Sequence, residues 1–88
     1  MKNNLVSIII RTKNEERWIG LCIEQIKKQN YKNYEIILVD SISKDKTVDK
    51  ARRHGIDKLI NISDYKPGKA INMGIQASNG ELIVILSA

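Results

Sequence analysis

Short apolar runs rich in isoleucine, leucine and valine alternate with segments of helical pattern along this 88-residue chain. Such runs are typical of strands buried on both faces, which is the situation in a parallel sheet. Strands that alternate with helices favour right-handed crossovers, with the helices packed on the sheet. The sequence therefore predicts an α/β fold of order β-α-β-α-β-α-β, with strands at residues 6–10, 35–40, 58–62 and 82–86.

The segments between these runs carry signals for three helices. Asn14 is a candidate N-cap, and apolar residues follow it at helical spacing: Trp18, Ile19, Cys22, Ile23 and Ile26. Ser43 or Asp45 is expected to cap the second helix, and Gly55 to end it. A third helix is expected over residues 67–78, because proline is favoured in the first turn.

Length, charge and cysteine content exclude several classes of protein. A chain of 88 residues is one domain at most, and no apolar run is long enough for a membrane span. No secretory cleavage site follows the first apolar run, and the single Cys22 excludes an intrachain disulfide, so a cytoplasmic setting is expected. The net charge of +5 favours anionic partners such as phosphates, nucleic acid or anionic lipid.

Polar residues follow the predicted strands where each strand ends. In open α/β sheets, ligands bind beyond the carboxyl ends of the strands, at the point where the strand order reverses. We therefore expect a cleft for a polar ligand at this edge, lined by residues 11–14, 40–41, 63–64 and 87–88.

Several well-known motifs are absent from this edge. The turn after the first run has no glycine until Gly20, so it lacks the dinucleotide-binding pattern, and Ala70 after Gly68-Lys69 breaks a P-loop. A phosphoacceptor domain would use Asp40 but also needs acidic residues at the end of the first strand, where Arg11 stands. His54 is interpreted as a solvated residue at a helix end.

The residues alone leave two interpretations open for each polar group. Asp40, with Ser41 beside it, is either a loop or helix cap or an acceptor for a base N–H or sugar hydroxyls. Lys69 and Asn72 share the polar face of the third helix. That face is either simply solvated or, with the helix amides near Gly68, a phosphate contact. The opposite face, with Ala70, Gly74 and Ala77, suggests close packing on the sheet.

Motifs in order along nearly the whole chain resemble those of the family 2 glycosyltransferases. They are VSIIIRTKNEE at 6–16, QNY at 29–31, YEIILVDS at 34–41, SKDKT at 43–47, GKAINMGI at 68–75 and ASNGE at 77–81. The resemblance implies the Rossmann-like first half of a GT-A fold, with strand order 3-2-1-4. It also implies transfer of a sugar from a nucleotide-diphosphate donor with inversion, and residues 1–88 would be the nucleotide-sugar-binding N-terminal part of a longer domain.

The resemblance also implies which residues bind the nucleoside. Carried over by position, Thr12 and Asn14 line the base and ribose pocket, with Glu15 near the ribose. Asp40 accepts a hydrogen bond from the base, and Ser41 sits beside it.

The loop residues depart from the commoner family pattern. That pattern has a proline at the position of Arg11 and an aromatic residue at that of Lys13, so stacking on the base is not carried over. Ile42 and Lys46 replace the usual glycines, which gives the second loop less freedom.

At the phosphate end, the resemblance implies that Lys69 and Asn72 reach towards the diphosphate. The family then carries Asp-x-Asp, which holds a divalent metal, Mn or Mg. Ser87 stands at the first of these positions, and the second would fall after Ala88, so the metal ligands of this chain are unknown and no cofactor is assured. The catalytic base and the acceptor site also lie further along the family's sequence, so we expect no catalytic residue here and no activity from residues 1–88 alone.

An alternative is a non-catalytic α/β module that binds a nucleotide or nucleic acid. Such modules use aromatic residues to stack bases, and this chain has few: Trp18, Tyr31, Tyr34 and Tyr65. We therefore expect a nucleotide-diphosphate sugar and an acceptor (glycan, lipid or protein) as partners, and no nucleic acid. Membrane association of the full-length protein and self-association through the apolar strand at 82–86 are further expectations.

Overall fold

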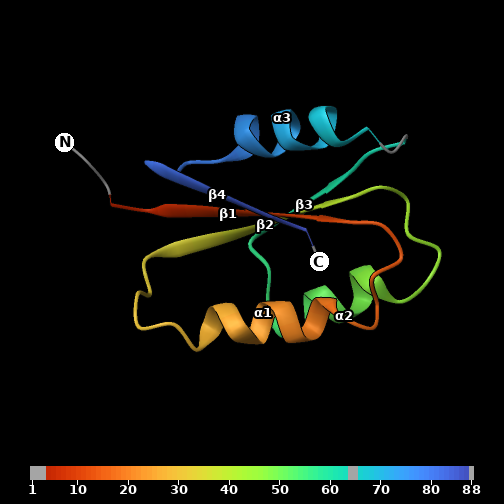
Figure 1. Ribbon diagram of the computed structural model, residues 1–88, viewed down its shortest axis with the longest axis horizontal. Helices are drawn as coiled ribbons and strands as arrows, with labels where there is room; N and C mark the ends of the chain where they lie inside the picture. Colours follow the sequence, from red (N-terminus) through yellow and green to blue (C-terminus); the bar gives the residue numbers. More distant parts are fainter. Residues whose placement is uncertain (1–3, 64–65, 88) are drawn as a thin grey trace.

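The computed structural model describes residues 4–63 and 66–87. Its elements are β1 (Val6–Thr12), α1 (Ile19–Lys27), β2 (Tyr34–Asp40), α2 (Thr47–His54), β3 (Lys58–Asn61), α3 (Pro67–Ala77) and β4 (Leu82–Ser87) (Figure 1). The predicted α/β class and element order are confirmed. The expectations for Asp64, Tyr65 and Ala88 fall outside the described residues.

All strand pairs are parallel, and the sheet has the predicted order β3-β2-β1-β4. α1 and α2 cover one face of the sheet and α3 covers the other (Figure 1). The chain moves from β1 to β2 and β3 in one direction and then crosses to the far side of β1 to form β4. The strand order therefore reverses between β1 and β4, which is where open α/β sheets bind ligands.

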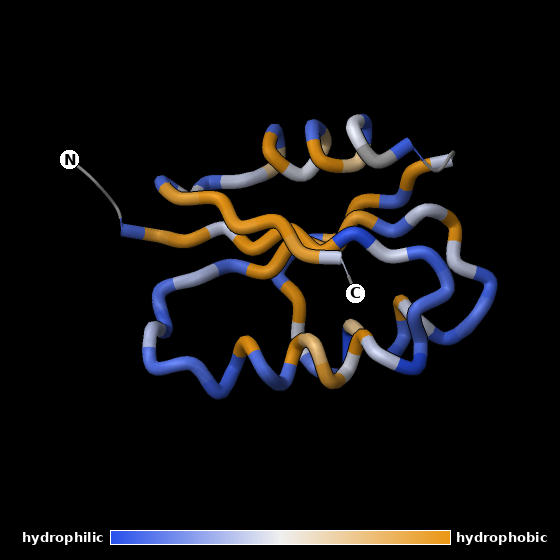
Figure 2. Tube along the Cα trace, in the orientation of Figure 1, coloured by the Kyte–Doolittle hydropathy of each residue, from blue (hydrophilic) through white to orange (hydrophobic). Residues whose placement is uncertain are grey.

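Two apolar clusters lie on the two faces of the sheet. Because side chains alternate along a strand, Ile8 and Ile10 of β1 pack with α1, whereas Ile9 packs with α3. The middle residues of β1 and β2, 8–10 and 36–39, are accordingly apolar without interruption, as the orange centre of the sheet shows (Figure 2). β1 and β2 thus form the buried middle of the molecule, and their polar carboxyl ends follow directly from it.

The small-residue face of α3 packs closely on the sheet, as the sequence predicts. Ala70 is buried, and a Cβ at Gly74 would lie 2.6 Å from Ile9 Cγ2. A larger side chain at either position would therefore push the helix away from the strand.

The start of the first helix differs from the expectation. α1 begins at Ile19, and Trp18 is 53% exposed instead of lying on the apolar face. The Glu15 carbonyl accepts the Trp18 and Ile19 N–H groups, so a turn precedes the helix. Asn14 is not the N-cap, because it adopts a left-handed conformation (φ 54°) that asparagine tolerates and its side chain bonds elsewhere.

The second helix follows the prediction more closely. The N-cap of α2 is Lys46, not Ser43 or Asp45, although Asp45 Oδ1 accepts the Thr47 N–H at 3.0 Å at the start of the helix. Gly55 ends the helix with φ 103°.

His54, expected to be solvated, instead packs over Gly20 and has its Nδ1 2.6 Å from Glu24 Oε2 of α1. This contact follows from the side-by-side packing of the two helices, which the sequence does not reveal.

Candidate functional site

The carboxyl ends of β1 and β2 bring predicted site residues together. Thr12 and Asp40 are partners in the strand register, and the Thr12 hydroxyl donates to Asp40 Oδ1 at 2.6 Å. Both side chains are 1% exposed. The Ser41 N–H donates to the Thr12 carbonyl at 2.9 Å, so Ser41 continues the contact between the two strand ends. Parallel neighbours end at one edge, which is why the sequence could place these three residues together.

Ser43 joins this cluster, whereas its place in the sequence predicts only a helix cap. Its hydroxyl donates to Asp40 Oδ1 at 2.6 Å, and its N–H donates to Asp40 Oδ2 at 2.8 Å. With the Thr12 hydroxyl, these bonds leave one lone pair of Oδ2 for a further donor. Asp40 therefore acts as a loop cap in this structure. Its contact with a base stays a prediction.

The loops that follow β1 and β2 are bonded into one unit. The Asn14 N–H donates to Ser43 Oγ at 2.8 Å, and Asn14 Oδ1 accepts the Lys44 N–H at 2.7 Å. The Glu15 N–H donates to Thr47 Oγ1 at 2.8 Å. The Glu15 carboxylate has no partner among the described residues, so it is available at the edge of this unit.

The remaining predicted residues lie apart from this unit. Lys69 and Asn72 are exposed in the first half of α3, which covers the other face of the sheet. Asp40 has the same parity in its strand as Leu38, which packs towards α1, so its carboxylate lies on the α1 side. A ligand that touches both groups must therefore cross the carboxyl edge of the sheet.

Arg11 and Ser87 form a contact at this edge that sequence reasoning missed. They are register partners of β1 and β4, and Arg11 Nη2 donates to Ser87 Oγ at 2.6 Å. Arg11 Nε is buried without a partner in the described chain. The one signal in the sequence for this contact is Arg11 itself, which stands where the commoner pattern of family 2 glycosyltransferases has proline.

The described residues at the end of β4 do not fit a divalent metal. Such an ion takes several hard oxygens, mostly from carboxylates, whereas Ser87 offers a neutral hydroxyl that already accepts from a guanidinium. In residues 4–63 and 66–87, no three or more His, Cys, Asp or Glu side chains lie close enough together to hold a metal ion.

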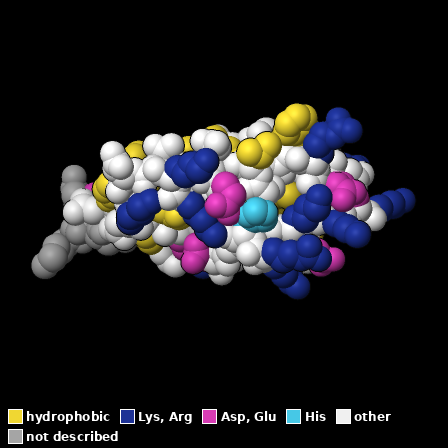
Figure 3. Space-filling model, turned by 90° about the horizontal axis from the view of Figure 1, so that it is seen from below, with side chains coloured by type: hydrophobic (Ala, Val, Ile, Leu, Met, Phe, Trp, Pro, Cys, Tyr) yellow, Lys and Arg dark blue, Asp and Glu magenta, His cyan; other side chains and the backbone are white. Residues whose placement is uncertain are grey.

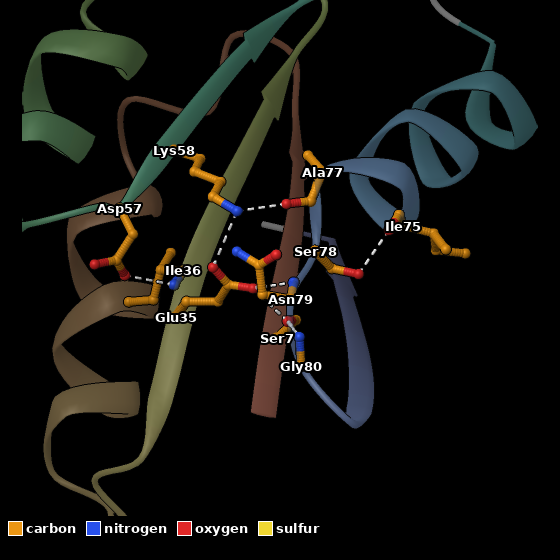
Figure 4. Close-up of polar contacts among 10 residues, drawn as sticks. All are labelled: Ser7, Glu35, Ile36, Asp57, Lys58, Ile75, Ala77, Ser78, Asn79 and Gly80. Atoms are coloured by element: carbon orange, nitrogen blue, oxygen red, sulfur yellow. Dashed lines mark hydrogen bonds and ion pairs between the residues drawn. The ribbon is translucent and has the colours of Figure 1, made fainter. Parts of the chain in front are cut away.

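The opposite end of the sheet carries a buried polar network and an apolar groove. Glu35, near the start of β2, contacts Ser7 of β1 and Lys58 of β3 (Figure 4). A groove of about 640 Å³ runs nearby, with Tyr31, Tyr34 and Leu82 among its lining residues. Neither feature lies at the carboxyl edge, so neither belongs to the candidate site.

The model of the family described as Glycosyl transferase family 2 matches residues 7–88. The chain belongs to glycosyltransferase family 2. Among curated relatives, this family 2 chain is 38% identical over 93 residues to a dolichyl N-acetyl-alpha-D-glucosaminyl phosphate 3-beta-D-2,3-diacetamido-2,3-dideoxy-beta-D-glucuronosyltransferase of Methanococcus voltae, covering 97% of the chain and 29% of that protein. It is 33% identical over 91 residues to glycosyltransferase GlyG of Streptococcus pneumoniae, covering 98% of the chain and 30% of that protein.

Solved structures share the fold of this family 2 chain. The mannosyltransferase PcManGT of Pyrobaculum calidifontis, in complex with GDP-Man and Mn²⁺, matches with a TM-score of 0.85 and 27% identity, over 93% of this chain and 26% of that one. TarS 1-349 of S. aureus in complex with UDP matches with a TM-score of 0.81 and 28% identity, over 99% and 27%. The GT-A fold is therefore confirmed. The chain spans less than a third of the length of these relatives and structures.

Proposed function

We propose that the protein carrying this chain transfers a sugar from a nucleotide-diphosphate donor to an acceptor with inversion, and that residues 1–88 form its nucleotide-binding part. The observation that carries this proposal is the Thr12–Asp40–Ser43 cluster at the carboxyl ends of β1 and β2. It lies at the edge where open α/β sheets bind ligands. The solved relatives that contain GDP-Man or UDP support a nucleotide-diphosphate donor.

The proposed residue roles follow the two faces of this edge. Thr12 and Asn14 line the base and ribose pocket, with Glu15 near the ribose, and Asp40 and Ser41 meet the base. The bonds to Asp40 leave one lone pair of Oδ2, which supports an acceptor role towards a base N–H. Because Asp40 is 1% exposed, the loop at residues 41–46 has to open to admit the base. Lys69 and Asn72 then contact the diphosphate from the α3 face.

The acceptor and the cellular setting are also proposals. The names of two relatives include dolichyl N-acetyl-alpha-D-glucosaminyl phosphate and undecaprenyl-phosphate, which supports a lipid-linked acceptor over a free glycan or a protein. A protein of this kind would work from the cytoplasm at a membrane. In residues 4–63 and 66–87, no helix has the length and apolar character that a membrane crossing requires.

The alternative of a nucleic-acid-binding module is not favoured. On the face formed by α1 and α2, lysine and arginine side chains are interspersed with acidic ones instead of forming a continuous basic groove (Figure 3). Nucleic-acid-binding modules concentrate their positive charge in such a groove or stripe.

The test is donor turnover by the complete protein. The protein is incubated with UDP-sugars and GDP-mannose together with a polyprenyl-phosphate-linked acceptor, and release of UDP or GDP is measured. Anomeric configuration by NMR reports inversion. Thr12→Val and Asp40→Asn are expected to lower release, whereas Asp49→Asn, on the exposed side of α2, is the matched control. Failure to bind any nucleoside diphosphate would contradict the proposal.

A further inference from the structure

The point where the strand order reverses is occupied by a pair of side chains. β1 and β4 are neighbours there, and Arg11 lies opposite Ser87 in the last register pair of these strands. The 2.6 Å bond from Arg11 Nη2 to Ser87 Oγ fixes the guanidinium across the junction. The guanidinium therefore lies at the junction where open α/β sheets bind ligands.

The positive charge of Arg11 is not balanced within the described chain. No carboxylate pairs with it in residues 4–63 and 66–87, and Ser87 Oγ is its side-chain partner there. The side chain is half-buried, and its Nε has no acceptor among these residues. A guanidinium offers five N–H donors, so most of its hydrogen-bonding capacity is unused. An anionic ligand would supply both the opposite charge and the hydrogen-bond acceptors that this partly buried cation lacks among the described residues.

The direction of the side chain places Arg11 on the α3 side of the edge. Ile9 packs with α3, and Arg11 has the same parity along β1. Asp40 lies on the α1 side of the same edge, by the same argument from Leu38. A nucleoside diphosphate whose base lies near Asp40 therefore passes Arg11 with its phosphates when it crosses the edge.

We propose that Arg11 binds the diphosphate of the donor, and that Ser87 positions the guanidinium for this contact. This inference rests on the proposed function, because it takes the ligand to be a nucleoside diphosphate. The planar guanidinium suits phosphate, since it gives two parallel N–H···O bonds as well as charge. Arg11 thus supplies positive charge at the end of β4, where the described side chains do not suit a divalent metal.

The test is calorimetric titration of the complete protein with UDP and GDP, and with uridine and guanosine. Arg11→Gln is expected to weaken diphosphate binding by about tenfold or more and to leave nucleoside binding unchanged. Arg11→Lys, which keeps the charge but loses the planar fork, is expected to fall between, and Ser87→Ala to cause a smaller loss. The matched control is Arg52→Gln, an exposed cation of α2. The salt dependence of diphosphate binding is expected to be weaker in Arg11→Gln.

Each outcome separates the two proposals. If Arg11→Gln binds the diphosphate as tightly as the unaltered protein, or loses diphosphate and nucleoside binding equally, the role of Arg11 is wrong while the proposed function stands. If the unaltered protein binds no nucleoside diphosphate, the proposed function fails. Circular dichroism checks folding. If Arg11→Gln does not fold, the Arg11→Lys variant provides the test. A loss of diphosphate binding without a loss of nucleoside binding in this variant supports the proposal, and diphosphate binding equal to that of the unaltered protein overturns it.

Discussion

Glu35 and Asn79 are 44 residues apart, yet the Asn79 N–H donates to Glu35 Oε2 at 2.7 Å. The same oxygen accepts the Ser7 hydroxyl at 2.6 Å, and Ser7 Oγ accepts the Gly80 N–H at 2.8 Å (Figure 4). These bonds attach the turn between α3 and β4 to the first residues of β1 and β2. They therefore fix β4 beside β1, which is the arrangement that brings Ser87 to Arg11 at the other end.

Replacing Glu35 with glutamine is expected to lower stability at neutral pH. The carboxylate is 8% exposed, and its Oε1 lies 3.3 Å from Lys58 Nζ. A glutamine amide can keep its oxygen on Ser7 and Asn79 but then presents N–H groups to the lysine. A lost hydrogen bond to a charged group costs about 1.5–3 kcal/mol, which urea unfolding at pH 7 would measure.

The same carboxylate is expected to make stability depend on pH. Burial alone would raise the pKa of Glu35, but hydrogen bonds from Asn79, Ser7 and Lys58 and the charge of Lys58 outweigh it and hold that pKa below its ordinary 4.5. A lowered carboxyl pKa contributes stability above the ordinary value, and this contribution is lost as pH falls through the folded value. Unfolding free energies between pH 7 and pH 3 should therefore fall more steeply for the unaltered chain than for Glu35→Gln. Asp49→Asn serves as the control, and parallel curves for all three proteins would contradict the prediction.

Asp40→Asn is expected to weaken nucleoside-diphosphate binding by about tenfold or more, because a neutral amide oxygen replaces a charged acceptor and a hydrogen bond to a charged group is worth about 1.5–3 kcal/mol. The loop itself should survive. The amide oxygen can face the Ser43 N–H, while the Thr12 and Ser43 hydroxyls can accept from its NH₂.

Asp45→Asn provides the comparison for Asp40→Asn. Asp45 accepts the Thr47 N–H at the start of α2 and the Glu16 N–H of the loop before α1, so its replacement should lower the melting temperature with much less effect on affinity. Calorimetric titration of both variants measures the difference. Equal losses of affinity would count against a base contact for Asp40.

The sequence predicts the sheet and part of the site for an identifiable reason. The apolar runs define β1 and β2, and parallel strands end together, so Thr12 and Asp40 could be placed at one edge. The bonds that Ser43 makes to Asp40 could not, because they depend on the path of a loop in which Ile42 has a positive φ of 45°. The Arg11–Ser87 bond links residues 76 apart and depends on the exact register of β1 and β4, which the apolar pattern leaves undetermined.

The isolated 88-residue chain is expected to self-associate at high concentration. β4 pairs with β1 along one edge, and no other described strand covers its second edge. Leu82, Val84 and Ile85 are 62%, 37% and 42% exposed. An apolar open edge is a template for pairing with another chain. Light scattering should give a mass above one chain that falls in Val84→Lys, since an edge lysine opposes pairing. A monomer at every concentration would refute the prediction.

Metal ions are expected to have little effect on nucleotide binding by the same 88 residues. Ser87 supplies a neutral oxygen, and the Arg11 guanidinium beside it repels a cation. Manganese or magnesium should therefore change UDP or GDP affinity by less than about tenfold, or roughly 1.4 kcal/mol, relative to the affinity measured with a chelator present.

Adding carboxylates, as Ser87→Asp together with an acidic residue after Ala88, should increase the metal dependence. The increase should be larger when Arg11→Ala also removes the competing guanidinium. Titrations at fixed ionic strength keep screening from being mistaken for coordination. A strong metal requirement in the unaltered chain would mean that carboxylates elsewhere, such as Asp40, supply the ligands.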